Sequence, residues 1–185
     1  MRSGLDIGAL QSLEGEERDR AEEMLLNYLP DTRGVIGLGE LRTTRAEPAI
    51  AEMLEATEGS DSKHAIPYLA KALWQIRPDA CWLNAMRRVL VSGNEIERAN
   101  AARAFKAFHD SAAVSVLIEA LDDPSNLVRH HAGRSVLAIY GLDDYTVHSN
   151  GQHVTMRVMS DDPEIREGAK KEILASISGR PMSAR

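Results

Sequence analysis

Six histidines are the residues of this 185-residue chain that could most readily hold a metal ion. His130 and His131 are adjacent, so on a helix they point to different faces and cannot easily share one ion. His148 and His153 flank Asn150-Gly151 and could meet across a hairpin, but no carboxylate or cysteine completes an obvious ligand set. The sequence therefore predicts no metal site.

Nucleophilic catalysis would require an activated cysteine or serine, and the sequence contains no such arrangement. Cys81, the one cysteine, stands next to Trp82 among apolar residues without a base nearby in sequence, which indicates a buried structural thiol. Trp74 and Trp82 could stack on a nucleobase or a tetrapyrrole, but their places in apolar helical patterns favour packing. The sequence also lacks glycine-rich phosphate loops and nucleophile elbows. We therefore expect no catalytic residue, no enzymatic activity and no cofactor.

Basic residues recur at a regular spacing, and they are the clearest candidates for binding. Lys71, Arg103 and Arg134 follow one another at intervals of 32 and 31 residues, and Lys171 continues the row. If each lies on a helix, polar residues three or four positions away share its face. The predicted partner-binding residues are His64, Tyr68, Lys71, Gln75, Asn100, Arg103, His131, Arg134 and Lys171. A second interpretation stays open, in which these residues only keep an exposed helix face soluble.

An internal repeat predicts the elements that position this row. Similar apolar segments end at Leu41, Ile76, Phe108 and Ile139, which are 35, 32 and 31 residues apart. That spacing has room for two helices of about a dozen residues and two short turns. The turns contain Pro, Gly, Asp, Ser and Asn, of which Asp, Ser and Asn are predicted to cap the helix that follows. We predict an all-α fold of helix pairs at 16–42, 47–76, 79–108, 111–140 and 153–177.

An insertion separates the fourth and fifth pairs, and its sequence supports two structures. Asn150-Gly151 favours a β-hairpin, whereas Met156 and Met159 recur at helical spacing. We expect a loop over 143–152 followed by a short helix, with the hairpin over 145–158 as the alternative.

Composition limits the class of protein further. The chain is 43% apolar and carries 28 acidic against 22 basic residues, for a formal charge of −6. This balance disfavours a general nucleic-acid binder. No apolar run approaches the roughly 20 residues that span a bilayer, and the N-terminus lacks the apolar core of a secretory signal. We expect one cytoplasmic domain over residues 1–185, flexible at 1–14 and 178–185 and without membrane association.

Several stretches carry a resemblance to a known repeat family. Residues 113–124, followed by Val128-Arg129 and by residues 135–139, match best, and residues 97–105 come next. Here the sequence resembles HEAT repeats in their short bacterial form, akin to phycobilisome-lyase HEAT-like repeats. The resemblance implies a right-handed α-solenoid of about five hairpins, whose second helices line a concave face. It also implies pairing with a turn carboxylate or carbonyl of the neighbouring repeat for Arg98, Arg129 and Arg166.

The predicted function combines the basic row with this resemblance. We expect a non-enzymatic protein–protein interaction module that binds an acidic protein partner in its concave groove, as an adaptor or a toxin-neutralising immunity-type inhibitor. Nucleic-acid binding in a basic groove, as in HEAT-like DNA glycosylases, is the alternative, which a sequence pI of about 5.5 disfavours. Bilin-lyase activity is the weakest interpretation, because the chain lacks evident chemistry for it. The sequence leaves the oligomeric state and the identity of the partner open.

Overall fold

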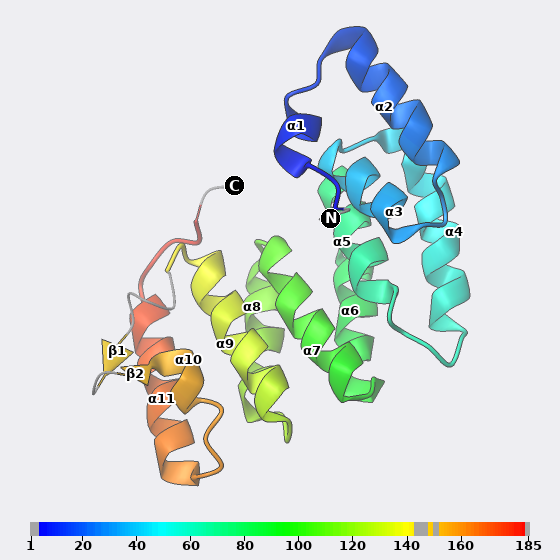
Figure 1. Ribbon diagram of the computed structural model, residues 1–185. Coiled ribbons are helices and arrows are strands. Elements are labelled where there is room, and N and C mark those ends of the chain that lie inside the picture. Colours follow the sequence, from blue (N-terminus) through cyan, green and yellow to red (C-terminus); the bar gives the residue numbers. More distant parts are fainter. Residues whose placement is uncertain (1–3, 143–147, 150–151, 184–185) are drawn as a thin grey trace. The chain divides into compact units, whose positions relative to one another are not determined.

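A computed structural model describes residues 4–142, 148–149 and 152–183 (Figure 1). The regular elements of the described residues are helices apart from one pair of two-residue strands, which confirms the predicted all-α fold class. Contacts between residues divide the chain into two compact units, 1–86 and 87–185. None of the described helices is long and apolar enough to cross a membrane. The single domain expected from the sequence stays a prediction.

In the first unit, the second helices of the first two predicted pairs pack directly on one another. The helices of this unit are α1 (Ile7–Gln11), α2 (Gly15–Asn27), α3 (Thr32–Glu40), α4 (Glu47–Glu58) and α5 (Ile66–Ile76), with the 3-10 turn η1 (Thr44–Ala46) before α4. The next helix, α6 (Ala80–Ser92), contains the division between the two units. α3 contacts α2 and α5, and α5 also contacts α4. Leu38, Ile50 and Leu73 lie at the centre of this core and are completely buried.

Glycines in α3 allow its neighbours to approach closely. A Cβ atom at Gly39 would lie 2.7 Å from the Cα of Ala72 in α5. A Cβ atom at Gly37 would lie 2.7 Å from a side-chain carbon of Leu25 in α2. Carbon atoms do not approach to that distance, so a larger residue at Gly39 would push α3 and α5 apart, whereas one at Gly37 would first displace the side chain of Leu25. In α3, the lower helix propensity of glycine is therefore offset by the close packing that it allows on two sides.

The second unit is centred on one helix. Its helices are α7 (Glu95–Ala104), α8 (Ser111–Glu119), α9 (Asn126–Ile139), α10 (Val154–Arg157) and α11 (Pro163–Ile177), with 3-10 turns η2 (Phe105–Ala107) and η3 (Ala120–Asp122). α9 contacts α7, α8, α10 and α11. Phe105, Phe108 and Leu137 are completely buried around it. Each of the five ranges predicted from the repeat thus contains two helices.

The insertion contains both features that the sequence left open. β1 (His148–Ser149) pairs antiparallel with β2 (Gln152–His153), and α10 follows directly at Val154. Asn150-Gly151, on which the hairpin alternative depends, lies outside the described residues, as do residues 143–147 of the expected loop. A strand pair and a short helix therefore coexist in this segment.

Arginines near the start of the second helices bind turns of the second unit. Arg98 donates to both carboxylate oxygens of Asp123, at 2.9 and 3.0 Å. Arg129 is 4% exposed and donates to the carbonyl of Val158 at 2.9 Å and to the turn before α9. Arg166 donates to a carbonyl in the turn before its own helix, at 3.2 Å. The structural role expected for these arginines is confirmed, although Arg166 bonds its own turn rather than a neighbouring one.

Two helix starts differ from the sequence prediction. Ser125 precedes α9, but its hydroxyl donates to a carboxylate oxygen of Glu95 at 2.6 Å and does not cap the helix. α5 begins at Ile66 with Pro67 in its first turn, the position that proline favours. His64 therefore lies in the preceding turn, and the helix does not place it in the predicted stripe.

Candidate binding site

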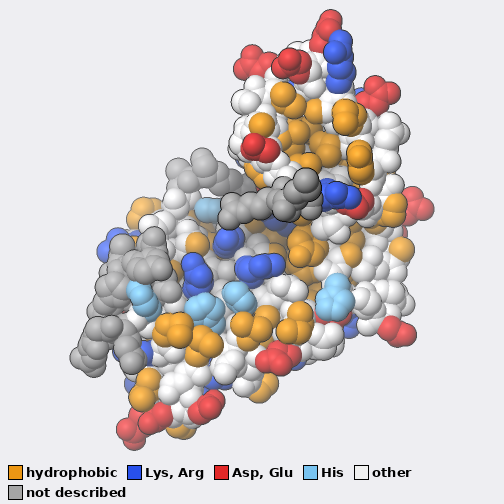
Figure 2. All heavy atoms as spheres, in the orientation of Figure 1, with side chains coloured by type: hydrophobic (Ala, Val, Ile, Leu, Met, Phe, Trp, Pro, Cys, Tyr) orange, Lys and Arg blue, Asp and Glu red, His pale blue; other side chains and the backbone are white. Residues whose placement is uncertain are grey.

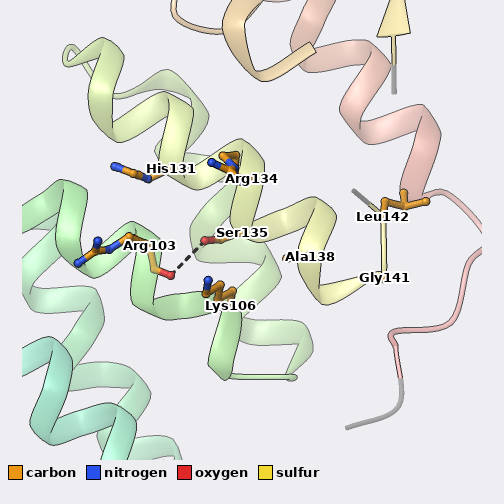
Figure 3. A pocket seen from close by; sticks show the side chains of 8 residues that line it. All are labelled: Arg103, Lys106, His131, Arg134, Ser135, Ala138, Gly141 and Leu142. Atoms are coloured by element: carbon orange, nitrogen blue, oxygen red, sulfur yellow. Dashed lines mark hydrogen bonds between the residues drawn. The ribbon is translucent and has the colours of Figure 1, made fainter. Parts of the chain in front are cut away.

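A hollow in the second unit brings three of the predicted binding residues together. It has a volume of about 420 Å³ and is lined by Arg103, Lys106, His131, Arg134, Ser135, Ala138, Gly141 and Leu142, which we call the basic hollow. Figure 2 shows Lys, Arg and His side chains gathered over α7 and α9. In Figure 3, Arg103 and Lys106 lie on one side of the hollow, and His131 and Arg134 lie on the other. Among the residues that the structure describes, no acid belongs to this lining.

The contact between α7 and α9 positions the charged side chains. The hydroxyl of Ser135 donates to the carbonyl of Ala102 at 2.8 Å, and both residues are buried. Arg103 and Arg134 adjoin these two residues in sequence, so they flank the contact on opposite helices. Lys106 lies three residues after Arg103 and is therefore its neighbour on the helix surface.

The end of α9 forms an uncharged wall of the hollow. Gly141 has a φ of +67°, a left-handed conformation that glycine adopts without steric cost. The N–H of Gly141 donates to the carbonyl of Ala138 at 3.1 Å, and the N–H of Leu142 donates to the carbonyl of Leu137 at 2.8 Å. The last carbonyls of the helix are thus bonded within the chain, and the polarity of the hollow comes from its cations.

The side chains of the hollow create a positive site. Within the described part of the chain, no carboxylate lies at ion-pair distance from Arg103, Lys106 or Arg134. Partial burial, followed by the charges of His130 and of these three cations, lowers the pKa of His131 to about 4. The ring of His131 is consequently neutral at pH 7. The hollow therefore favours an anionic ligand.

Two of the predicted binding residues, Lys71 and Gln75, bond the carboxylate of Glu40 within the first unit instead. Nζ of Lys71 lies 3.0 Å from Glu40, whose side chain is 12% exposed. Gln11 donates to the other carboxylate oxygen at 3.0 Å, and Gln75 also bonds this carboxylate. Burial alone would raise the pKa of Glu40, but the bonds from Gln75, Lys71 and Gln11 and the charge of Lys71 lower it. Lys71 and Gln75 are thus engaged within their own unit.

The remaining predicted residues lie beside the hollow or outside it. Asn100 accepts a hydrogen bond from Arg103 at 3.3 Å. Tyr68 is half-buried on α5, and His64 is exposed before that helix. Lys171 is exposed on α11 and does not line the hollow. One continuous row from Lys71 to Lys171 stays a prediction.

Two charged residues that matter here are absent from the predicted set. Lys106 could have been found from its spacing of three residues after Arg103, since both lie on one helical surface. Glu40 carries a weaker signal, an opposite charge 31 residues before Lys71. That spacing gains meaning only when α3 and α5 are known to pack together.

Other candidates for chemistry have ordinary structural surroundings. The rings of His130 and His131 meet edge to face with centroids 5.4 Å apart, and Nδ1 of His130 lies 3.4 Å from the carbonyl of Thr155. In the described ranges, no group of three or more His, Cys, Asp or Glu residues is arranged to hold a metal ion.

Cys81 is exposed, so the expectation of a buried thiol is wrong. The residue lies in the first turn of α6, where its N–H donates to the carboxylate of Asp79 at 2.9 Å, and its side chain remains outside the core. Partial desolvation, and then the adjacent Asp79, raise the pKa of the thiol to about 11. Cys81 is therefore a protonated thiol at neutral pH rather than an activated nucleophile.

Comparison with known families identifies one repeat. Residues 97–123 match the PBS lyase HEAT-like repeat family, which confirms the resemblance seen in the sequence. The match begins in α7 and ends just after η3, and the bonded residues Arg98 and Asp123 lie near its two ends. HEAT-like repeats are generally protein-interaction or scaffold modules. No curated protein matches the sequence.

Proposed function

We propose that this chain is a non-enzymatic protein-binding module that holds an acidic surface of a protein partner at the basic hollow. The observation that carries the proposal is that Arg103, Lys106 and Arg134 line one hollow, and that no acid is found among its described lining residues. Because packed helices already hold these residues, a partner has less conformational entropy to remove on binding. A positive site also raises the rate of encounter with a negatively charged partner.

The repeat architecture supports the same function. We propose that the five helix pairs continue as a right-handed solenoid whose second helices line a concave face that includes the hollow. The contacts of α3 with α5, and of α9 with α7 and α11, support this stacking within each unit. Small-angle X-ray scattering in solution tests it, since a solenoid gives an elongated, curved envelope. A globular envelope would contradict the solenoid and leave the hollow unchanged.

Capture of the partner tests the role of the hollow. Three forms of the chain are compared: the wild type, Arg103→Glu with Arg134→Glu, and Arg20→Glu with Arg42→Glu. The last pair changes the net charge equally at exposed arginines of the first unit. We expect the hollow variant alone to bind the purified partner at least tenfold more weakly, since about 1.4 kcal/mol suffices for that change. Unchanged binding by a folded hollow variant would overturn the proposal.

The captured partner then decides between the two roles proposed for a cytoplasmic module of this kind. An immunity-type inhibitor suppresses the toxic or enzymatic activity of its partner at a stoichiometric ratio. An adaptor leaves that activity intact and recruits a third protein. Activity assays of the partner with and without this chain distinguish these outcomes.

Nucleic acid is the competing ligand for a basic hollow. Contacts to three phosphates would give a log–log salt dependence with a slope of roughly −3. We expect no stable complex with duplex DNA at physiological salt, because the net charge of −6 repels it. A salt-dependent complex that the Arg103→Glu, Arg134→Glu variant loses would replace the protein-binding proposal.

A further inference from the structure

The α3–α5 contact of the first unit and the α7–α9 contact of the second share one register. At the first contact, Gly39 lies against Ala72, which is 33 residues later. At the second, Ala102 accepts the hydrogen bond of Ser135, which is also 33 residues later. The two contacts can therefore be compared position by position.

The residues beside these contacts differ in charge. In this register Glu40 corresponds to Arg103, and Lys71 corresponds to Arg134. The first contact contains its own anion, because the Glu40 carboxylate lies 3.0 Å from Lys71. The second contact has a cation, Arg103, at the corresponding position, and no acid is found among the described residues that line the hollow beside it. An anion supplied from outside the chain could lie between Arg103 and Arg134 and provide the counter-charge that Glu40 provides in the first unit.

We propose that the basic hollow binds a phosphate monoester carried by a phosphorylated serine or threonine of the protein partner. This inference rests on the proposed function and specifies its ligand. In the first contact, the Glu40 carboxylate accepts hydrogen bonds from one cation, Lys71, and from two side-chain amides, those of Gln11 and Gln75. The hollow instead offers two arginines and one lysine. A phosphate monoester matches them better, since it carries close to two negative charges and three strong acceptor oxygens.

The types of the three cations fit a phosphate. Arg103 and Arg134 can each donate two parallel hydrogen bonds to phosphate oxygens, while Lys106 supplies a compact charge. Arg134 lies on α9, and Arg103 and Lys106 lie on the α7–η2 segment, so the cations line the hollow from two elements. Ser135 does not compete for the ligand, because its hydroxyl already donates to Ala102.

The pKa of His131 can report whether an anion is bound in the hollow. The ring of His131 faces His130 on α9, Arg103 and Lys106 on the α7–η2 segment, and Arg134 one turn along α9. Burial and, after it, these positive charges hold the pKa of His131 near 4. A dianion in the hollow would oppose the effect of the cations and raise this pKa. A phosphate bound elsewhere would leave His131 unchanged.

Nuclear magnetic resonance of the full chain tests the inference with two small probes. N-acetyl-phosphoserine amide and N-acetyl-glutamate amide are titrated separately at pH 7, and the His131 ring is assigned with a His131→Asn variant. We expect the phosphoserine probe to bind with a Kd of about 1 mM, at least tenfold tighter than the glutamate probe. The Arg103→Glu, Arg134→Glu variant should lose this binding. Arg20→Glu, a charge reversal at an exposed residue of the first unit, should retain it.

The outcomes separate this inference from the proposed function. Equal binding of both probes, or no binding of phosphoserine, overturns the phosphate site. Treatment of the captured partner with phosphatase provides an independent arm, in which release supports the inference and unchanged capture overturns it. If capture depends on Arg103 and Arg134 but survives phosphatase, the proposed function stands and the phosphate site fails. Tight binding of inorganic phosphate with capture that survives phosphatase indicates free phosphate and likewise overturns it.

Discussion

Two contacts between second helices, α3–α5 and α7–α9, share a register and differ in the charges beside it. In the first contact the cation has its counter-charge within the chain, because a carboxylate oxygen of Glu40 lies 3.0 Å from Nζ of Lys71. The second places Arg103 and Arg134 around a hollow that has no acid among its described lining residues. Two like charges 8–10 Å apart repel by only roughly 0.4 kcal/mol in water. Two contacts can therefore share the same helix packing although one has its counter-charge within the chain and the other, in our proposal, receives it from a ligand.

The largest effect is expected where α3 and α5 come closest. Gly39→Ala would place a Cβ atom 2.7 Å from the Cα of Ala72, a backbone atom that can move only if α5 moves. We expect a loss of about 2–4 kcal/mol in the free energy of unfolding of the first unit. Urea unfolding followed by tryptophan fluorescence measures it, because Trp74 and Trp82 both belong to this unit.

Gly168→Ala is the matched control for Gly39→Ala. It lies in α11, and an added Cβ would meet no atom within 4 Å. We expect a gain of up to about 1 kcal/mol, since alanine favours a helix over glycine. Circular dichroism measures both variants, and a similar change at the two positions would contradict the close packing at Gly39.

The pH dependence of stability should come next in size and should differ between the two contacts. His131 has a folded-state pKa of about 4, below its ordinary value of 6.5, so the unfolded chain binds more protons between these values. Stability present above about pH 6.5 is therefore lost as the pH falls toward 4, by on the order of 1–3 kcal/mol. His131→Asn should flatten this part of the profile, whereas exposed His64→Asn should follow the wild type.

Glu40 should act in a lower pH range than His131. Its folded-state pKa is lowered from an ordinary value of 4.5, so its contribution is present above that pH and is lost below it. Glu40→Gln should therefore lower the free energy of unfolding above about pH 4.5 and remove the loss of stability on the acid side. A Glu40→Gln profile whose slope changes near pH 6 would contradict the assignment.

Removal of one cation from each contact should have unequal effects. Lys71→Met leaves the mostly buried Glu40 carboxylate without its counter-charge, so we expect a loss of about 1–2 kcal/mol. Arg134→Met removes a charge that has a cation rather than an acid opposite it, so we expect a change within about 0.5 kcal/mol. Chemical denaturation of the two variants provides the comparison, and equal losses would mean that Arg134 is already paired.

The smallest effect on stability is expected from converting the second contact into a copy of the first. Arg103→Glu places an acid opposite Arg134, as Glu40 lies opposite Lys71. We expect a gain of about 0.2–0.5 kcal/mol together with the loss of phosphoserine binding. Arg103→Gln is the control, which should weaken binding without the gain. Retained binding by Arg103→Glu would show that the anion does not use this position.

Much of the fold could be predicted from short-range patterns. Apolar residues at helical spacing predicted the helix pairs, and Asn94 caps α7 with Glu97 returning the bond, as an asparagine in that turn suggests. The errors concern single side chains. Ser125 bonds Glu95 rather than α9, and Cys81 is exposed, because side-chain direction depends on neighbours that are distant in sequence.

The candidate site could be predicted only in part, because the basic row mixes two kinds of residue. Alignment of the apolar endings placed Lys71, Arg103 and Arg134 in one row, and two of these three line the hollow. Lys71 does not act as they do, since Glu40 neutralises it from the preceding second helix. A spacing near 32 residues says that two positions recur, but it does not say which residue of one helix meets which residue of the next.

The sequence by itself determined which segments form helices, since helical period and turns depend on residues only a few positions apart. The tertiary structure decided which charges meet, since that depends on the register between packed helices. At Gly39 and Ala72 that register rests on one missing Cβ atom, and at Ala102 and Ser135 on one hydrogen bond. An ångström-scale shift at either contact would change which side chains face one another, and apolar periodicity does not encode such a shift.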